Sequence, residues 1–244
     1  MGGILFNFLV WAHRGASSQA PENTMAAFLA AEAAGASGIE LDVHLSRDGV
    51  AVVIHDETLE RTTNGQGPVS RRTYQEIRAL DAGSWFGPAF RGEGVPSLEE
   101  VMAWAGGRLR LNIEIKAAEA GLAVLDLQER YPDVNVLLSS FNHRLLAKIH
   151  RMAPELALGY LVEVPLWHLA LKRAVRHQAA SFHPRVDRVS RAMVTACRRQ
   201  GMDIVPWTVD DLEQLDALRR QGVQGVFTND PQKIIQHLAR GRRR

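Results

Sequence analysis

Cysteine, long apolar runs and net charge are all scarce in this sequence of 244 residues. The single cysteine, Cys197, cannot form an intramolecular disulfide, which predicts a reducing, cytoplasmic setting and a buried structural thiol. No run approaches the roughly 18 apolar residues that a membrane span needs, so no membrane insertion is expected. The apolar stretch before His13 lacks the basic start and the small-residue cleavage site of a signal peptide, so we do not expect it to be removed.

The small net charge argues against a polyanionic partner. The formal charge is +2, from 29 Lys+Arg and 27 Asp+Glu, and the terminal GRRR supplies three of the arginines. Without them the balance is 26 against 27, a net charge of −1. A short basic tail is usually solvated and disordered, so we expect no nucleic-acid binding and a small-molecule partner. Nothing in the sequence indicates the oligomeric state.

Strand-like and helix-like segments alternate along the chain. Hydrophobic residues make up 46% and charged residues 23%, near globular averages, so a sizeable core is expected. The alternation predicts a parallel sheet with helices outside it, and 244 residues suit one α/β barrel. The sequence therefore predicts a single domain over residues 1–244, with a (β/α)8 TIM barrel fold. The strands are expected at 8–13, 38–46, 50–56, 109–116, 135–141, 157–162, 179–184, 203–209 and 225–229.

One of these nine segments is surplus to an eight-stranded barrel. Residues 50–56 follow the preceding strand after only Arg47-Asp48-Gly49, a hairpin turn, whereas a parallel crossover needs a dozen or more residues. We expect the hairpin to pair residues whose numbers sum to about 97, which places Asp42 opposite His55. Residues 57–97, rich in glycine, proline and serine, are expected to form an insertion over one face of the domain.

Acidic side chains are placed to meet at the ends of neighbouring strands. Glu40 and Asp42 are two residues apart and face the same side of a strand, and Glu114 lies in the next barrel strand. Three carboxylates suit one hard divalent cation, Mg²⁺ or Ca²⁺. The alternative is a set of buried ion pairs with Arg14 and Lys116, but three acids against two bases leave an excess negative charge.

Two histidines complete this cluster. His13 and His55 end different strands, where barrel active sites form, and such a pair can act as general base and acid. His183, also at a strand end, is a reserve candidate. Arg14 and Lys116 can bind a phosphate. A cation, two histidines and two basic side chains suit the hydrolysis of a phosphodiester.

The motifs resemble the glycerophosphodiester phosphodiesterases, especially the small cytosolic bacterial type. The matching segments are AHRG at 12–15, PENT at 21–24, GIELDVHLSRDG at 38–49, VVIHDETLERTTNGQG at 52–67, LDAGSWF at 80–86, VPSLEEV at 95–101, IEIK at 113–116, SSF at 139–141, PWTV at 206–209 and GVFTNDP at 225–231. The resemblance implies a distorted (β/α)8 TIM barrel, with residues 57–97 as an insertion over the active-site face. It also implies a metal-dependent hydrolysis of glycerophosphodiesters to sn-glycerol 3-phosphate and an alcohol. The roles it implies are acid and base for His13 and His55, metal ligands for Glu40, Asp42 and Glu114, and phosphate contacts for Arg14 and Lys116.

The resemblance leaves some roles open. It places Glu22 in support of the site, and Trp207 as a wall for the glycerol or the alcohol, although core packing is an equal alternative. Asn229 stands where relatives often have an acid, and the segment around Asp187 matches loosely; neither is expected to touch the catalytic set.

Two other functions remain possible. A lysophospholipase D activity on single-chain phospholipids would need an apolar groove, which Trp85, Phe86 and Phe90 could form. A binding module that no longer cleaves should have lost a site residue, yet all seven are present.

Overall fold

The computed structural model describes residues 8–163 and 165–241. The expectations about the leader and about the arginine tail concern residues 1–7 and 242–244, which lie outside this range. None of the helices within the described ranges is long and apolar enough to cross a membrane.

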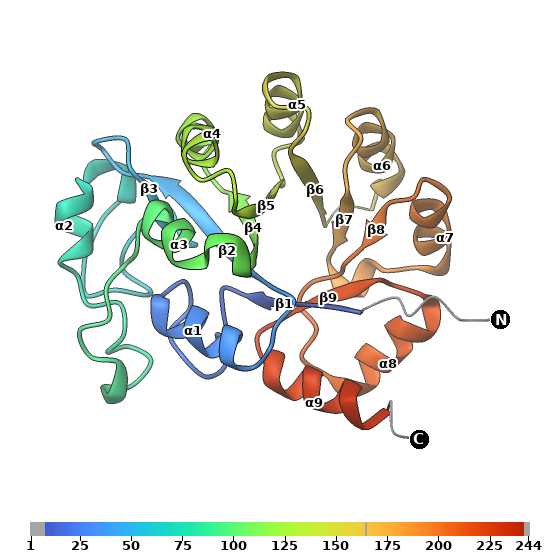
Figure 1. Ribbon diagram of the computed structural model, residues 1–244, viewed down its shortest axis with the longest axis horizontal. Coiled ribbons are helices and arrows are strands. Elements are labelled where there is room, and N and C mark those ends of the chain that lie inside the picture. The colour runs from blue at the N-terminus through green and yellow to red at the C-terminus, as the bar shows by residue number, and fades with distance from the viewer. Residues whose placement is uncertain (1–7, 164, 242–244) are drawn as a thin grey trace.

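Eight parallel strands form a nearly closed barrel, as the sequence predicted (Figure 1). Their order around the sheet is β8-β7-β6-β5-β4-β2-β1-β9. The bounds are β1 Leu9–His13, β2 Gly38–Leu45, β4 Arg110–Ile115, β5 Asn135–Ser140, β6 Ala157–Val162, β7 Ser181–Pro184, β8 Asp203–Ile204 and β9 Gly225–Thr228.

The barrel is distorted at the junction of β8 and β9. The expected strand 203–209 is regular only over Asp203–Ile204, because Pro206 has no N–H to donate to a ladder. Three backbone hydrogen bonds still close the junction, Gln224 N to Ile204 O at 3.2 Å, Phe227 N to Pro206 O at 2.9 Å and Val209 N to Phe227 O at 2.8 Å.

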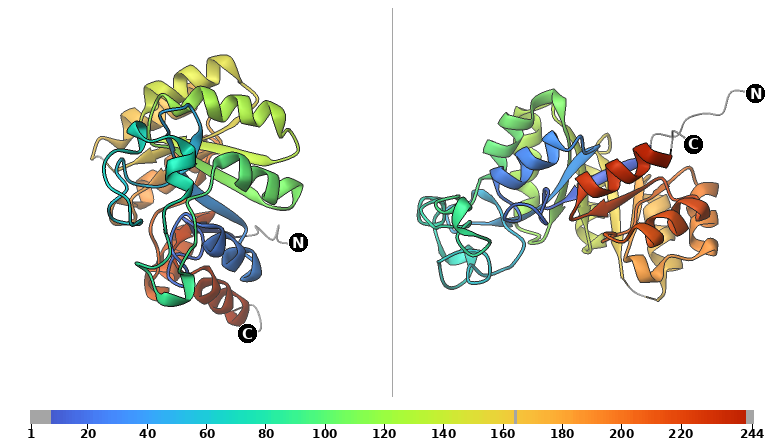
Figure 2. Two further views of the ribbon diagram at one scale, coloured as in Figure 1. Left: turned by 90° about the vertical axis from the view of Figure 1, so that its left-hand side faces the viewer. Right: turned by 90° about the horizontal axis from the view of Figure 1, so that it is seen from below.

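Helices surround the barrel in the order that the alternation predicted (Figures 1 and 2). Their bounds are α1 Met25–Ala33, α2 Tyr74–Arg78, α3 Leu98–Ala105, α4 Ala120–Arg130, α5 His143–Met152, α6 Trp167–Arg176, α7 Arg191–Arg199, α8 Leu212–Gln221 and α9 Pro231–Gly241. Short 3-10 helices span Val69–Arg71, Pro88–Phe90, Gly106–Arg108 and Val186–Arg188. Thr24 caps α1, and Ser97 and Glu100 form a capping box at α3.

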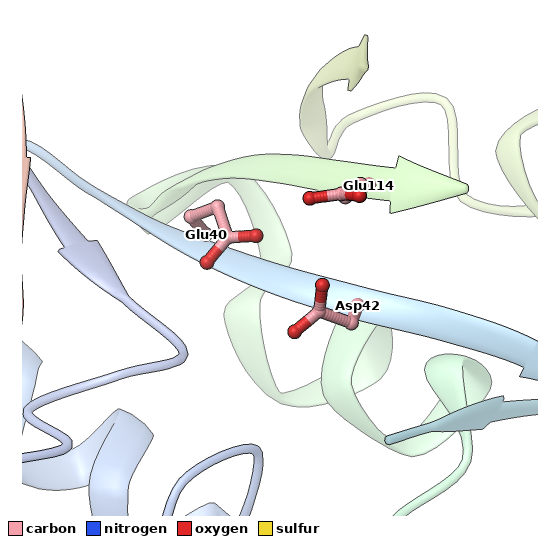
Figure 3. A group of neighbouring side chains, drawn as sticks. All are labelled: Glu40, Asp42 and Glu114. Atoms are coloured by element: carbon pink, nitrogen blue, oxygen red, sulfur yellow. The ribbon is translucent and has the colours of Figure 1, made fainter. Parts of the chain in front are cut away.

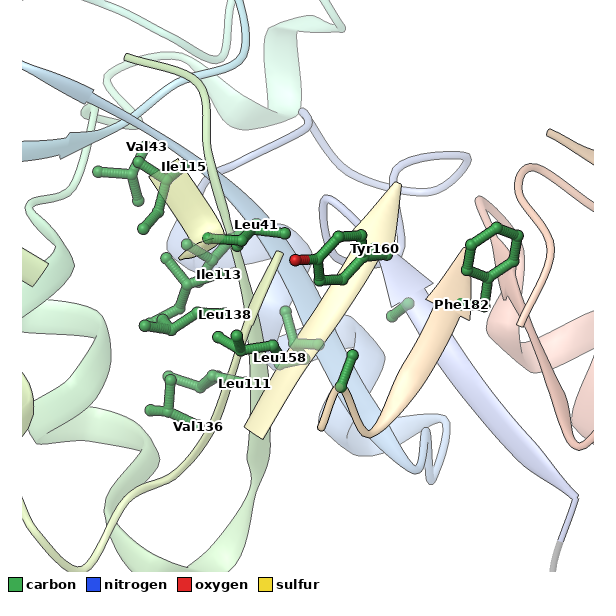
Figure 4. Close-up of a cluster of buried hydrophobic side chains, with 14 of the residues drawn as sticks. Leu41, Val43, Leu111, Ile113, Ile115, Val136, Leu138, Leu158, Tyr160 and Phe182 are labelled. Atoms are coloured by element: carbon green, nitrogen blue, oxygen red, sulfur yellow. The ribbon is translucent and has the colours of Figure 1, made fainter. Parts of the chain in front are cut away.

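The main core lies between the sheet and the helices. Alternate strand residues point outward into it, among them Leu41 and Val43 of β2, Ile113 of β4, Tyr160 of β6 and Phe182 of β7 (Figure 4). The residues between them, such as Glu40 and Asp42, face the barrel interior. The apolar face thus holds the strands in place, and the opposite face is free for polar chemistry.

The ninth strand, β3 (Ala51–Val53), pairs antiparallel with β2 and lies outside the barrel, as predicted. The predicted register was wrong by one residue. Paired residues sum to 96, as in Val43 with Val53, and the backbone N–H of Ile54 donates to Asp42 O at 3.0 Å. Asp42 is therefore opposite Ile54, and His55 follows the strand instead of pairing in it.

Residues 57–97 form a unit at one side of the barrel, beyond the end of β2 (Figure 1). The unit includes α2 and packs on β3 and Ile54 through a small second core, made by Val52, Ile54, Leu59, Val69, Ile77, Ala82 and Val95.

Candidate active site

Three buried carboxylates meet between the neighbouring strands β2 and β4. Glu40 and Asp42 project from β2, and Glu114 projects toward them from β4 (Figure 3). Parallel pairing sets Asp42 beside Glu114, and the three side chains offer oxygen atoms within 4.8 Å of one another. The three proposed metal ligands are thus brought together as the sequence indicated.

The electrostatics of this triad show a deficit of positive charge. Burial, together with the charge of Asp42, raises the pKa of Glu40 well above its usual value and that of Glu114 to about 7. Burial would also raise the pKa of Asp42, but the neighbouring positive charges, led by Arg14, and the hydrogen bond from Asn23 together outweigh burial and lower the pKa. A divalent cation would remove the cost of these neighbouring negative charges, so the donor set fits such an ion.

The two expected phosphate-binding side chains lie beside the triad. Lys116 Nζ is 2.9 Å from Glu114 Oε1 and 3.7 Å from Asp42 Oδ1, and Arg14 Nε is 3.3 Å from Asp42 Oδ2. Asp42 and Glu114 therefore form ion pairs with these two basic side chains. Among the described residues, the only hydrogen-bond donor to the Glu40 carboxylate is the backbone N–H of Arg14, at 2.9 Å.

The turn after β1 explains how Arg14 enters the site. Arg14 and Gly15 both have positive φ values, 58° and 83°. A Cβ at Gly15 would lie 2.7 Å from the backbone of Ala27 in α1, so only glycine fits there. This sharp turn aims the backbone N–H of Arg14 at Glu40 and its guanidinium at Asp42.

Each proposed catalytic histidine has one ring nitrogen held by a neighbour. His13 Nδ1 is 2.8 Å from Asn229 Oδ1, and His55 Nδ1 is 2.6 Å from Asp56 Oδ1. His55 Nε2 lies 3.1 Å from Lys116 Nζ. Burial, reinforced by the charge of Arg14, lowers the pKa of His13 to about 4, which keeps that ring neutral near pH 7. Nε2 is therefore the nitrogen that Asn229 and Asp56 leave for proton transfer, and in His55 it faces Lys116.

Glu22 joins the site to the insertion. Its carboxylate accepts from Arg14 Nη1 at 2.9 Å and from both terminal nitrogens of Arg61 at 2.8 and 2.9 Å. Arg61 also donates to Asp56, with Nε to Oδ2 at 2.6 Å. Arg61 therefore links Glu22, which binds Arg14, to Asp56, which binds His55.

A cavity of about 230 Å³ lies between the triad and a set of apolar side chains. It is lined by His13, Arg14, Glu40, His55, Asn112, Glu114, Lys116, Ser139, Phe141, Leu161, Glu163, Trp207 and Phe227. Trp207 packs edge-on against Phe141, and its Nε1 donates to His183 O at 2.9 Å. Trp207 thus lines the cavity, and its hydrogen bond to His183 O fixes it to the barrel.

Some candidates lie away from this cavity. The three aromatic residues considered for an apolar groove, Trp85, Phe86 and Phe90, pack on one another in the insertion and are not among the lining residues. His183, the reserve candidate, is buried beneath the cavity, where its Nε2 pairs with Ser181 Oγ at 2.7 Å. Burial lowers the pKa of His183 to about 3.

Sequence reasoning missed several supporting residues. Asn23 donates from Nδ2 to Asp42 Oδ2 at 2.9 Å. The expectation that Asn229 stays clear of the catalytic set was wrong, because its side chain orients His13. Asn229 is itself held by Asp210, to which its Nδ2 donates at 2.7 Å. The motif PENT pointed to Asn23, but no local signal marked Asp210.

Comparisons with known proteins agree with this geometry. The model of the glycerophosphoryl diester phosphodiesterase family matches residues 13–233. The chain is 42% identical over 243 residues to a glycerophosphodiester phosphodiesterase of Caldanaerobacter subterraneus subsp. tengcongensis, covering 96% of this chain and 98% of that protein. It is also 34% identical to one from Bacillus subtilis, covering 91% and 84%.

Solved structures give the same result. A phosphodiesterase of Oleispira antarctica, in complex with the product sn-glycerol-3-phosphate, superposes with a TM-score of 0.88 at 33% identity, covering 95% of this chain and 96% of that one. A glycerophosphodiester phosphodiesterase from Thermotoga maritima gives a TM-score of 0.80 at 29% identity, covering 94% and 98%. The chain therefore belongs to the glycerophosphoryl diester phosphodiesterase family and is a phosphoric diester hydrolase.

Proposed function

We propose that the protein hydrolyses glycerophosphodiesters to sn-glycerol 3-phosphate and an alcohol, in a metal-dependent reaction with His13 and His55 as general acid and base. The observation that carries this proposal is one cavity lined by both histidines, two of the three triad carboxylates and both basic side chains. The product bound by the Oleispira antarctica relative supports the choice of product.

We assign Glu40, Asp42 and Glu114 as the ligands of one divalent cation, Mg²⁺ or Ca²⁺. The assignment is supported by the raised pKa of Glu40 and Glu114, which reflects buried negative charge without enough neutralising partners. Such an ion, when bound, acts as a Lewis acid that polarises a phosphoryl oxygen and favours ionisation of the attacking hydroxyl.

Arg14 and Lys116 bind the phosphate in this proposal. Arg14 presents a planar fork suited to two oxygen atoms, and Lys116 presents a point charge. Lys116 bonds Glu114 and His55 in the structure, so a phosphate would compete for its protons. Both charges stabilise the negative charge that builds on the phosphoryl oxygens in the transition state.

The two histidines perform the proton transfers. With Nδ1 of each ring committed to Asn229 or Asp56, the reacting nitrogen is Nε2 in both. One Nε2 accepts the proton of the attacking hydroxyl, and the other donates a proton to the leaving alcohol oxygen. Glu22 supports this arrangement by holding Arg14.

The apolar side of the cavity, with Trp207 and Phe141, is assigned to the carbon skeleton of the substrate. Two other lining atoms, Asn112 Oδ1 and Ser139 Oγ, are buried without a hydrogen-bond partner among the described residues, which suits them to contact substrate hydroxyls. A volume near 230 Å³ is small for a ligand site and favours a short diester over a single-chain lipid.

The test is release of sn-glycerol 3-phosphate from a panel of glycerophosphodiesters, with and without a chelator. The chelator should abolish release, and added Mg²⁺ or Ca²⁺ should restore it. His13→Ala and His55→Ala should each lower kcat by about 10²–10⁴. His237→Ala is the matched control, since His237 forms a surface ion pair with Asp216, and it should keep full activity. Full turnover by His13→Ala, or insensitivity to the chelator, would contradict the proposal.

We also infer that residues 1–244 act as one domain and that the protein works in a reducing, cytoplasmic setting. Cys197 supports the second inference, because it is buried and burial raises the pKa of its thiol to about 12, so it is poorly reactive.

A further inference from the structure

Positive charge is concentrated in one part of the barrel. Residues 141–200 contain eleven Lys or Arg and three Asp or Glu, a net charge of +8. The rest of the chain contains 18 basic and 24 acidic residues, a net charge of −6. The near-neutral total therefore hides a strongly dipolar molecule.

The basic residues lie on the outer faces of three neighbouring helices. Helices α5, α6 and α7 follow one another in the ring around the barrel (Figure 1). None of the three contains an acidic residue. Their exposed basic side chains are Arg144, Lys148 and Arg151 on α5, Lys172, Arg173 and Arg176 on α6, and Arg191, Arg198 and Arg199 on α7. We call these nine residues the basic face.

Local stability accounts for only part of the basic face, since five of the nine residues lie in last helical turns. Among the described residues, no acidic side chain forms an ion pair with any of the nine. Cations in a last helical turn are favoured by the helix dipole, but Arg144 and Arg191 occupy first turns, where a cation is disfavoured. Like charges one turn apart, as at Arg144 and Lys148, also repel each other.

Large apolar side chains project from the same face. Leu166 and Leu169, at the start of α6, are 65% and 51% exposed. Residues 166, 169, 172, 173 and 176 share one stripe of the helix, so the leucines continue the row that Lys172 and Arg176 form. Leu166 is only three residues after Glu163, which lines the cavity. The stripe thus begins beside the active-site mouth.

We propose that the basic face docks this enzyme on an anionic lipid surface. The cations would lie among the negatively charged headgroups, and Leu166 and Leu169 would enter the boundary with the acyl chains. This combination favours a lipid surface over a nucleic acid, because phosphate backbones offer the leucines no apolar layer. Docking would be peripheral, and it would place the cavity mouth near the bilayer.

The experiment is sedimentation of the whole protein with vesicles of phosphatidylcholine, with or without phosphatidylglycerol. Binding should require phosphatidylglycerol and should weaken as NaCl is added. Each surface cation contributes about a fivefold gain in affinity. The variant Lys148→Glu/Lys172→Glu should therefore bind about 25-fold more weakly or worse. Its new glutamates lie one turn from Arg144 and Arg176, so the fold is not at risk.

A matched control distinguishes the effect of the basic face from the effect of the protein's net charge. Arg71→Glu/Arg91→Glu makes the same change in charge on exposed residues of the insertion, and it should bind vesicles as the unchanged protein does. Leu166→Ser/Leu169→Ser should weaken binding at least about tenfold while leaving its salt dependence unchanged.

Three results would overturn the proposal. The first is that the two charge-reversal variants lose the same amount of vesicle affinity. The second is that the unchanged protein does not bind phosphatidylglycerol vesicles, and the third is that it binds duplex DNA more tightly than those vesicles. Turnover of a soluble glycerophosphodiester should be unchanged in all three variants, which shows that they are folded and that docking is independent of the chemistry.

Discussion

Replacing Asn229 by aspartate tests how the protein orients His13. Asn229 Nδ2 donates to Asp210 Oδ2 at 2.7 Å, so Asn229→Asp brings two carboxylates into contact. At this distance, with an effective dielectric constant of about 20, two unit charges repel by about 6 kcal/mol. Solvent and proton uptake by the new carboxylate should reduce the observed loss of stability to about 2–3 kcal/mol.

The exchanged variant, Asp210→Asn/Asn229→Asp, should recover this stability. In the structure Asp210 Oδ1 accepts from Thr228 Oγ1 and the backbone N–H of Asn229, and the amide oxygen of an asparagine at 210 can do the same. Its amide nitrogen can then donate to the carboxylate at 229, which still accepts from His13. That carboxylate also favours protonated His13, so the acidic limb of the pH–rate profile should move to higher pH.

The assay is denaturant unfolding of the single and double variants at several pH values between about 5 and 9, with kcat measured over the same range. The free energy of unfolding of Asn229→Asp should fall as pH rises, since the folded state holds a proton that the unfolded state releases. An Asn229→Asp protein as stable as the unchanged one at high pH, or an exchanged variant no more stable than the single one, would refute the reasoning.

Three further predictions concern residues that support the site. Asn23→Ala removes the hydrogen bond to Asp42 and should weaken Mg²⁺ or Ca²⁺ binding, measured by titration calorimetry, by about 10–100-fold; unchanged affinity would contradict it. Because His183 has a folded pKa of about 3, the unfolded state binds more protons below about pH 6.5, and stability should fall by about 2 kcal/mol between pH 6.5 and 5. His183→Leu should lose this part of the pH dependence, and an unchanged slope would show that other groups cause it. A Cβ at Gly159 would lie 2.4 Å from His183 Cε1 and 2.8 Å from Leu137 Cδ2, so Gly159→Ala should cost about 1–3 kcal/mol in urea unfolding, whereas Gly241→Ala, which meets nothing within 4 Å, should cost little.

Much of the barrel and its acidic triad could be predicted from sequence, because both follow from strong local rules. Alternation of strands and helices fixes a parallel sheet, and the two-residue period of a strand sets Glu40 and Asp42 on one face. The short link at Asp48-Gly49 excluded a parallel crossover, so β3 could be assigned outside the barrel.

Other features depend on contacts that no local pattern encodes. The hairpin register differs by one residue, because a turn sequence restricts the loop without fixing which residues pair. Asn229 and Asp210 reach His13 only because β9 lies beside β1 in the closed barrel. The basic face was likewise not predicted, because the net charge of the whole chain does not show where on the surface the charges lie.

The second core, which the insertion shares with β3, has a consequence for how the enzyme can vary. Because residues 57–97 pack mainly on one another and on β3, their length and sequence can change without repacking the barrel. Arg61 and Glu93 are among the exceptions, since Arg61 donates to Asp56 and Glu22, and Glu93 accepts the backbone N–H of Ala26 in α1 at 3.0 Å. The insertion could therefore take another shape without altering the cavity, which none of residues 57–97 lines, as long as the replacement still supplies these contacts.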